Sequence, residues 1–346
     1  MNSILITGGS GFFGRILSRW LAERGFQCTN IDLLVHNEQD TPNIRHVQID
    51  VTDAVQVNRV FKNHHFDAVI HCAAMLPLSD TSKTSLWKTN VQGTCNIAQA
   101  AADHAVKKLV FTSTSCLWGQ PMGRPVTEAD TPHPVDIYGE SKWEAEKCLE
   151  QFRGRFDYVI LRIPLIVDAG RMGLLAILFE FIEEGRSVWV VGRGRNRYHF
   201  VLASDLAHAC ECSLNYHGSG VFNVGSDDVK PMREVYQSVI QQANSSSQVR
   251  SLPRSLTLVA MRLCYMLGIS PLGAYHRRLI ADDFIFDTTH IKNTLGWAPT
   301  ATNEQMLFRA YEYYLAHRHV IHNLHSNSTT CQPAKMGIIR LLKWIS

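Results

Sequence analysis

Short apolar runs alternate with longer amphipathic stretches along the first half of the chain. The runs have the length of buried strands and cover residues 4–7, 27–32, 68–71, 108–113 and 158–161. Apolar positions with helical spacing lie between them, over residues 13–23, 54–61, 86–104 and 138–151. Strands that alternate with helices of this length predict βαβ units and a parallel sheet. We therefore expect an α/β fold built on a doubly wound parallel sheet.

Beyond about residue 165 this alternation becomes irregular. Helical patterns cover residues 174–184, 232–243, 256–267 and 304–317, and short strand patterns cover residues 197–201 and 221–224. Residues 243–252 are polar and predict a loop. We expect a first domain over 1–165, a smaller mixed α/β substrate domain over 166–322 with segments that return to the first sheet, and a linker with a short tail over 323–346.

Composition and charge narrow the class of protein. With 346 residues, 45% of them hydrophobic and 19% charged, the chain has the composition of a soluble globular protein. Its net charge of +3 gives no argument for nucleic-acid binding. Nine cysteines without regular spacing predict reduced thiols and a cytoplasmic location. We expect no secretory signal, no membrane span and no metal site, since Cys210 and Cys212 fall in a helical stretch and point in different directions.

A glycine-rich segment, residues 7–14, directly follows the first apolar run and opens the first helical stretch. Gly8 would permit a tight turn, Gly11 a close approach of the backbone to a pyrophosphate, and Gly14 close packing of the helix on the sheet. The N-terminus of that helix would offer free N–H groups to phosphates. This strand–turn–helix context predicts a Rossmann domain that binds a dinucleotide.

Two acidic positions bear on the choice of coenzyme. Asp32 ends the second strand about 20 residues after the motif, where a carboxylate accepts hydrogen bonds from the adenosine ribose. It would repel the extra phosphate of NADP, so we expect NAD. Asp50 and Val51 lie between the predicted strands 27–32 and 68–71 and could contact the adenine, although an ordinary turn aspartate explains Asp50 nearly as well.

Tyr138 and Lys142 stand four residues apart and share one face of a predicted helix. A nearby ammonium group favours the phenolate, which moves the tyrosine toward proton exchange at neutral pH. Such a pair is common on helix surfaces, but here the hydroxyl cluster Thr112–Ser115 precedes it at the end of the predicted strand 108–113. Ligands of open parallel sheets bind at the carboxyl ends of strands, so one of these hydroxyls could hold a substrate oxygen.

With these motifs the chain resembles the extended short-chain dehydrogenases/reductases of the NAD-dependent epimerase/dehydratase family. The resemblance extends to about residue 318 and is specific for the family, not for the substrate. The matching positions are Gly8–Gly14, Asp32, Asp50-Val51, 71–74, 90–94, the hydroxyl cluster, Tyr138 and Lys142, 161–162, 200–201, 205–207, 223–225 and 295–299.

The resemblance implies roles for individual residues. Thr114 would be the catalytic hydroxyl, with Ser113 as the reserve choice, and Tyr138 would exchange a proton with the substrate. Lys142 would also bind the nicotinamide ribose, and Asn90 would support the active-site helix. The implied coenzyme contacts are Gly8, Ser10, Gly11, Phe12, Phe13, Gly14, Asp32, Asp50, Val51, Cys72, Ala73, Ala74, Asn90, Tyr138, Lys142 and Pro164. The candidate substrate contacts are Met75, Ser115, Arg197 and Arg277.

The chain departs from the family pattern in three places. Dehydratases resemble Thr-Asp-Glu where this chain has Thr114 followed by Ser115 and Cys116, which disfavours dehydration. Epimerases usually carry an asparagine shortly after the Leu-Arg of the sixth strand, where residues 163–165 are Ile-Pro-Leu. The diphosphate-binding arginine is replaced by Tyr198, with Arg197 one residue out of register. Arg277 and Arg278 could still clamp a phosphate, or all three arginines could be solvated surface.

Two enzymatic interpretations and one non-enzymatic interpretation remain. We favour an NAD(P)-dependent oxidoreductase that acts on a secondary alcohol or ketone of an apolar substrate, as in the hydroxysteroid-dehydrogenase-like branch. Residues 255–267 would then cover an apolar pocket, or form an ordinary packing helix. The alternative is a nucleotide-sugar 4-epimerase with tightly bound NAD. The third is a dinucleotide sensor or scaffold, although such proteins typically lose the Tyr or Lys that Tyr138 and Lys142 provide here. The resemblance also implies a homodimer through the helices near 86–104 and 138–151.

The C-terminal residues carry two further patterns. Four histidines between residues 317 and 325 have no carboxylate or cysteine at suitable spacing, and we interpret them as a frayed, solvated helix end rather than a metal site. Residues 335–346 place four aliphatic side chains on one helical face, opposite Arg340 and Lys343. A basic amphipathic helix with a tryptophan can lie in a bilayer interface. Weak peripheral membrane contact is therefore one hypothesis, and docking on the body or on a partner subunit is the other.

Overall fold

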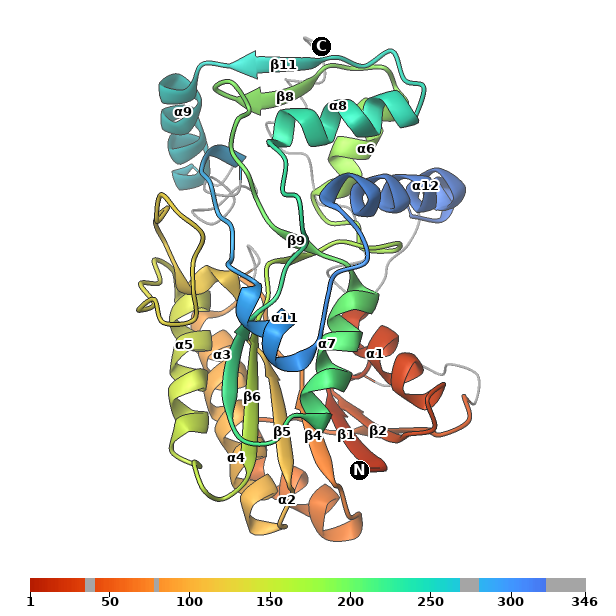
Figure 1. Ribbon diagram of the computed structural model, residues 1–346, viewed down its shortest axis with the longest axis vertical. Coiled ribbons are helices and arrows are strands. Elements are labelled where there is room, and N and C mark those ends of the chain that lie inside the picture. The colour runs from red at the N-terminus through yellow and green to blue at the C-terminus, as the bar shows by residue number, and fades with distance from the viewer. Residues whose placement is uncertain (35–40, 78–80, 268–279, 322–346) are drawn as a thin grey trace.

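The computed structural model describes residues 1–34, 41–77, 81–267 and 280–321, and its centre is a seven-stranded parallel sheet (Figure 1). The strands lie in the order β10-β6-β5-β4-β1-β2-β3, and each neighbouring pair is parallel. Their bounds are β1 Ser3–Thr7, β2 Gln27–Asp32, β3 Ile44–Gln48, β4 Ala68–His71, β5 Lys108–Thr112, β6 Asp157–Arg162 and β10 Gly220–Asn223. The predicted doubly wound α/β fold is confirmed.

Helices cover both faces of this sheet. One face carries α1 (Phe12–Ala22), α7 (Ala203–Asn215) and α11 (Thr289–Leu295), and the other carries α2 (Ala54–Asn63), α4 (Gly93–Asp103) and α5 (Ile137–Glu150). Successive residues of a strand point to opposite faces, so β1 places Ile4 and Ile6 in one core and Leu5 in the other. Burial on both faces explains why these strands are continuous apolar runs in the sequence.

The helix predicted over 86–104 consists of three consecutive segments. α3 (Lys83–Trp87) continues into a π-helical turn (Lys88–Gln92) and then into α4. It begins earlier than predicted because the hydroxyl of Ser82 accepts the N–H of Ser85 and caps the first turn. π-helical turns occur frequently at functional sites, and Asn90 lies within this one.

A second, smaller part lies beyond the carboxyl ends of the strands (Figure 1). Its elements are β7 (Leu165–Ile166), α6 (Leu175–Glu183), β8 (Val188–Val191), β9 (Phe200–Val201), α8 (Met232–Gln242), β11 (Val249–Leu252), α9 (Arg254–Met266) and α12 (Asn303–Ile321). The loop predicted over 243–252 is wrong at its end, because Val249–Leu252 pair with β8 in a two-stranded parallel sheet. The exposed Arg250 and Ser251 make this strand too polar to recognise from its pattern. α11 was likewise not predicted. The boundaries proposed for the two domains stay a prediction.

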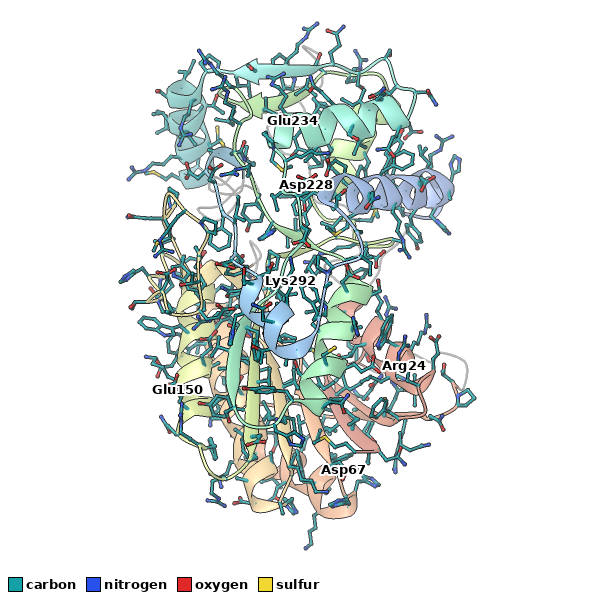
Figure 2. All side chains as sticks on the ribbon, viewed as in Figure 1. Arg24, Asp67, Glu150, Asp228, Glu234 and Lys292 are labelled. Atoms are coloured by element: carbon teal, nitrogen blue, oxygen red, sulfur yellow. A yellow bond between two sulfur atoms is a disulfide. The ribbon has the colours of Figure 1, made fainter. Side chains whose placement is uncertain are left out.

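The two ends of the sheet are tied by polar contacts. In Figure 2, Asp67 marks the end where β4 begins, and its carboxylate accepts the N–H groups of Asn2 and Ser3 at 2.7 and 3.2 Å. Lys292 of α11 lies toward the second part of the molecule and binds Asp227, which follows β10. The carboxyl ends of the strands therefore face the second part, where a ligand of this fold class binds.

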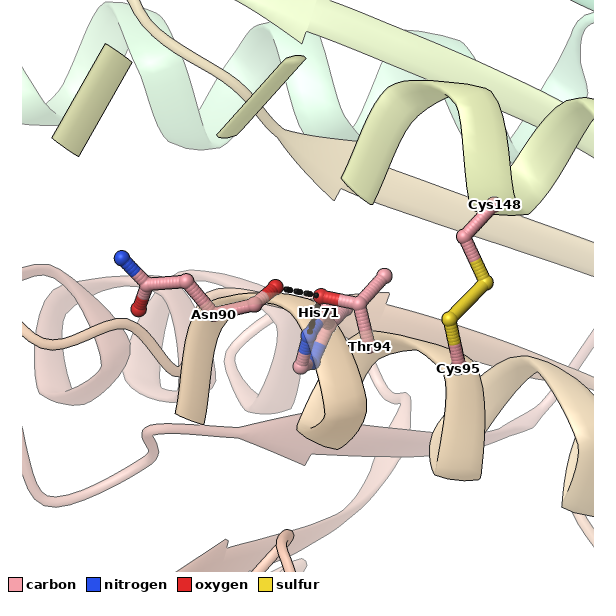
Figure 3. The surroundings of a disulfide bond; sticks show 5 residues. All are labelled: His71, Asn90, Thr94, Cys95 and Cys148. Carbon is pink, nitrogen blue, oxygen red and sulfur yellow. Dashed lines mark hydrogen bonds between the residues drawn. A yellow bond between two sulfur atoms is a disulfide. The ribbon is translucent and has the colours of Figure 1, made fainter. Parts of the chain in front are cut away.

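Cys95 on α4 and Cys148 on α5 form a disulfide (Figure 3). The prediction of reduced thiols is wrong for this pair, because the two helices pack together and bring the two Cα atoms to 6.0 Å, within disulfide range. Among the described residues, Cys210 and Cys212 on α7 are free thiols. The described part of the chain contains no group of three or more His, Cys, Asp or Glu side chains that could hold a metal.

Two sequence patterns near the C-terminus lie partly or wholly outside the described residues. α12 continues to Ile321, and His317 donates a hydrogen bond to the carbonyl of Tyr313 and stacks on its ring, so this part of the histidine segment is ordered helix rather than frayed. His322, His325 and the amphipathic tail 335–346 are outside the described residues. No helix in the described ranges is long and apolar enough to cross a membrane.

Candidate active site

The glycine-rich segment forms a narrow turn between β1 and α1. Gly8 has φ +69°, and the N–H groups of Gly8 and Gly9 both point to the carbonyl of Ile31. A Cβ on Gly8 would lie 2.9 Å from Ala73 Cα, and a Cβ on Gly14 would lie 2.1 Å from the Gly8 carbonyl oxygen. Side chains at either position would therefore disrupt the turn.

This turn fits the pyrophosphate of a dinucleotide. α1 begins at Phe12, and its N-cap residue Gly11 provides no side chain to occupy the first N–H groups of the helix. Those N–H groups and the positive end of the helix dipole suit phosphate oxygens. Phe12 and Phe13 are both buried and belong to the core between α1 and the sheet.

The acidic candidates lie at the ends of β2 and β3. Asp32 accepts the N–H of Ser10 at 3.0 Å, which connects it directly to the glycine-rich turn. Asp50 accepts the N–H of Thr52 at 2.8 Å in the turn that precedes α2. Val51 is buried, and its carbonyl accepts a hydrogen bond from the Asn96 side chain. A carboxylate at this end of the second strand is the kind of group that accepts hydrogen bonds from an adenosine ribose.

A buried hydrogen-bond network connects β1, β4 and α4. The hydroxyl oxygen of Thr7 accepts the N–H groups of Cys72 and Ala73 at 3.1 and 3.0 Å and lies 2.6 Å from His71 Nδ1. Because this oxygen already accepts two hydrogen bonds, its own proton is directed to Nδ1, and the His71 proton must sit on Nε2. His71 Nε2 then donates to the Thr94 hydroxyl at 2.9 Å, and Thr94 donates to the Asn90 carbonyl at 2.7 Å (Figure 3).

This network keeps His71 neutral. Burial lowers its pKa to about 3, and the charge of Lys142 acts in the same direction. A neutral histidine with one fixed tautomer is a structural connector rather than an acid–base group at physiological pH. Sequence analysis matched His71 to the family but gave no role to Thr7, His71 or Thr94.

Asn90 extends the network to the helix that bears the catalytic pair. Its side-chain oxygen accepts the N–H of Met75 at 2.7 Å, and its amide group donates to the Met75 carbonyl and to the Ser141 hydroxyl at 3.1 and 3.0 Å. Ser141 in turn donates to the carbonyl of Tyr138 at 2.8 Å. Asn90 therefore fixes both α5 and the segment 72–75 that follows β4, in line with its implied supporting role.

Thr114, Tyr138 and Lys142 are brought together at the carboxyl end of β5. α5 begins after Asp136, whose carboxylate accepts the N–H of Gly139, and this cap places Tyr138 in the first turn. Burial raises the pKa of Tyr138, while its hydrogen bond with Thr114 and the charge of Arg171 act to lower it. Burial lowers the pKa of Lys142 to about 7, and its ammonium nitrogen lies 4.0 Å from the centre of the Phe111 ring.

The reserve hydroxyl has a different environment. Ser113 donates a 2.5 Å hydrogen bond to Glu146 on α5, and Arg162 of β6 contacts the same carboxylate through Nε and Nη2, the latter at 2.7 Å. All three side chains are buried. The hydroxyl of Ser113 is therefore occupied by the Glu146–Arg162 ion pair. This favours Thr114 as the hydroxyl that would bind a substrate. The sequence does not indicate a role for Glu146, because only the fold brings it to Arg162.

The described geometry has counterparts in known proteins. Residues 4–225 match the model of the NAD dependent epimerase/dehydratase family. The chain belongs to this family. An uncharacterized protein, y4nG of Sinorhizobium fredii, is 35% identical over 92% of this chain and 80% of its own length. A UDP-glucose 4-epimerase of Lactobacillus helveticus is 26% identical over 91% of this chain and 97% of its own. The crystal structure of UDP-glucose 4-epimerase from Thermotoga maritima with UDP-glucose superimposes with a TM-score of 0.75 at 23% identity, covering 91% of this chain and 99% of that one.

The remaining family positions are partly assembled at this site. Met75 and the segment 72–74 are half-buried beside Asn90, and Pro164 is buried directly after β6. Ser115 is buried and lies 3.4 Å from the hydroxyl of Tyr198, the residue that replaces the family's diphosphate-binding arginine. Arg197 is half exposed and directed to Asp283. Arg277 lies outside the described residues.

Arg171 is a site residue that the sequence did not indicate. It follows β7 in the second part of the chain, and its guanidinium carbon lies 5.6 Å from the centre of the Phe12 ring. Its charge also reaches Tyr138, whose pKa it lowers. The preceding turn is anchored because Asp168 accepts the N–H of Ala169 and pairs with Arg309. No motif marks an arginine in this irregular segment, so only the fold could reveal it.

Proposed function

We propose that this chain is an NAD-dependent nucleotide-sugar 4-epimerase, which oxidises a ring hydroxyl and re-reduces the resulting ketone from the opposite face. The observation that carries the proposal is the hydrogen bond between the buried Thr114 and the half-buried Tyr138, one helical turn from the buried Lys142, at the carboxyl end of β5. The similarity to a UDP-glucose 4-epimerase over nearly its whole length supports a nucleotide sugar as substrate.

The residues of the site would divide the chemistry. NAD, when bound, supplies the hydride acceptor and donor. Thr114 would hold the substrate oxygen, and Tyr138 would take the hydroxyl proton and return it in the reverse half of the cycle. Lys142 would hold the nicotinamide ribose and favour the phenolate of Tyr138. Asp32 would bind the adenosine ribose, which supports NAD over NADP.

A dehydrogenase that acts on an apolar alcohol is the second candidate. Tyr198, with its hydroxyl toward Ser115, occupies the place of the diphosphate-binding arginine, and Arg197 is directed to Asp283. Residues 163–165, Ile-Pro-Leu, contain no asparagine where epimerases usually carry one. Both features weaken the binding of a nucleotide diphosphate and favour a less polar substrate.

A homodimer through the helices near 86–104 and 138–151 is proposed with either activity. A concave surface there is lined by Trp87, Val91 and Ile137 and by polar side chains that include Lys83 and Lys88, and Trp87 is exposed. Tryptophan is enriched at subunit interfaces. Sedimentation velocity of the protein and of a Trp87→Glu variant would test this assembly.

The test of function starts with the coenzyme. The purified protein is denatured, and the released nicotinamide is identified by mass spectrometry. We expect about one NAD per chain, because the epimerase cycle regenerates its coenzyme internally. The protein is then incubated with UDP-glucose and UDP-N-acetylglucosamine in D2O, and C4 inversion without deuterium incorporation is expected.

A Tyr138→Phe variant is the matched control. It should retain NAD and lose turnover by at least about 100-fold, because it removes only the proton-exchanging group. Coenzyme that binds and leaves reversibly, together with NADH formation on an apolar secondary alcohol, would instead establish the dehydrogenase. A Tyr138→Phe variant with full turnover would contradict both.

A further inference from the structure

Helix α9 presents a continuous apolar stripe to solvent. Leu256, Val259, Leu263, Met266 and Leu267 are between 54% and 72% exposed. At 100° per residue these positions fall within an arc of about 100° on the helix surface. Met261, on the opposite side, is 9% exposed and faces the body. The expectation that this segment covers an apolar pocket is therefore wrong for the stripe, which points outward.

Basic groups lie on α9 and on the segments next to it. α9 contains no acidic residue, and it carries Arg262 at the edge of the stripe. The loop after β8 starts against the beginning of α9, since Gly192 donates its N–H to Leu252 at 2.8 Å. Exposed arginines lie on α9 (Arg254 and Arg262), on β11 (Arg250) and in the segment after β8 (Arg193, Arg195 and Arg197), and we call them the arginine rim. Asp282 and Asp283 pair with Arg254 and Arg197, which leaves a net positive rim.

We propose that α9 and its arginine rim form a docking face for a lipid bilayer that carries anionic headgroups. An amphipathic helix with a basic border lies in the plane of the interface, with its apolar face among the acyl chains. Arginines at the border gain from the negative surface potential of the bilayer. Figure 1 shows α9 on the outside of the second part, remote from the carboxyl ends of the strands where the coenzyme would bind.

Charge selects the bilayer over two other occupants. A second copy docked symmetrically on this face would bring two arginine rims together, and like charges in an interface oppose association. The segment 335–346 contains Lys335, Arg340 and Lys343 and no acidic residue, so its sequence is basic. Anionic lipid complements the rim and this tail alike, whereas the tail and the rim repel each other.

The test is vesicle flotation of the full-length protein. The vesicles are pure phosphatidylcholine, or phosphatidylcholine with phosphatidylglycerol as the anionic component. We expect flotation with the anionic vesicles, reduced at high salt, and little flotation with the neutral ones. A Leu256→Ser/Leu263→Ser variant should lower the partition coefficient at least about tenfold, because two anchoring side chains lose their transfer into the interface.

Val55→Ser provides the matched control. Val55 on α2 is 69% exposed, as is Leu256, but it belongs to the first part of the molecule, and its loss should leave flotation unchanged. Arg250→Glu/Arg262→Glu should lower flotation while the apolar stripe stays intact. Circular dichroism and coenzyme content check that each variant is folded.

Three results would overturn the proposal. The first is a wild-type protein that fails to float with anionic vesicles. The second is a Leu256→Ser/Leu263→Ser variant that floats as the wild type does, while Leu341→Ser/Leu342→Ser in the tail abolishes flotation. The third is a Leu256→Ser/Leu263→Ser variant that is monomeric where the wild type is dimeric, as measured by sedimentation velocity without lipid. This result would assign the stripe to contact with a second copy of the chain.

Discussion

The buried ion pair between Glu146 and Arg162 offers the sharpest test of the packing beneath the active site. Their side chains are 4% and 7% exposed, and Glu146 also accepts the hydroxyl of Ser113. Changing Glu146 to Gln keeps the shape but leaves the Arg162 charge without a counterion in the interior. Removing one partner of a buried pair costs about 3–5 kcal/mol, so we expect the free energy of unfolding to fall by about 3 kcal/mol.

The same helix supplies the control. Glu144 pairs with Lys147 at 2.5 Å, but these side chains are 42% and 45% exposed. Glu144→Gln should cost about 0.5 kcal/mol or less, because solvent screens the exposed pair. Urea unfolding followed by circular dichroism measures both variants at one pH.

A double variant tests whether the unpaired charge, rather than the changed shape, lowers the free energy of unfolding of Glu146→Gln. Glu146→Gln combined with Arg162→Met removes both charges and should recover about half of the loss caused by Glu146→Gln alone. If Glu146→Gln costs no more than Glu144→Gln, the pair is not desolvated in solution and the reasoning fails.

Two further predictions concern the polar groups around the catalytic pair. Burial lowers the pKa of Lys142 to about 7, so between that value and the ordinary one near 10.4 the folded protein binds one proton fewer than the unfolded chain. The free energy of unfolding should therefore rise with pH across this window by about 1 kcal/mol per pH unit, and Lys142→Met should remove that rise; parallel curves for the two proteins from pH 7 to 9 would contradict this. Thr94→Val should cost about 1–3 kcal/mol in urea unfolding, because His71 Nε2–H loses its acceptor and the Asn90 carbonyl its donor; an unchanged midpoint would show that water replaces the hydroxyl.

The sequence predicts the sheet well because every central strand is buried on both faces. Such a strand has one apolar run with no alternative placement, and the bounds of β2 and β4 agree with the predicted 27–32 and 68–71. β11 could not be predicted, since two of its four residues are exposed polar side chains and it pairs with the four-residue strand β8. Its formation depends on tertiary pairing rather than on its own pattern.

The same distinction between local pattern and tertiary contact applies to the residues of the candidate site. Tyr138 and Lys142 could be predicted because helical spacing alone places them on one face. Glu146 and Arg171 could not, because each acquires its role from a partner distant in sequence, Arg162 in one case and Phe12 in the other. The disulfide between Cys95 and Cys148 follows the same logic, since only the packing of α4 on α5 makes it feasible.

The π-helical turn Lys88–Gln92 has a consequence for aligning this chain with its relatives. A π turn accommodates one residue more than a regular α-helical turn, and each residue of an α-helix rotates the chain by about 100°. A relative with a one-residue gap here would have a regular helix, with Ser82 and Leu86 rotated by about a quarter turn relative to Thr94 and Cys95. Asn90 could then not reach Ser141 and Met75 together. A gap in an alignment at this turn therefore marks a chain that must support its active-site helix by other contacts.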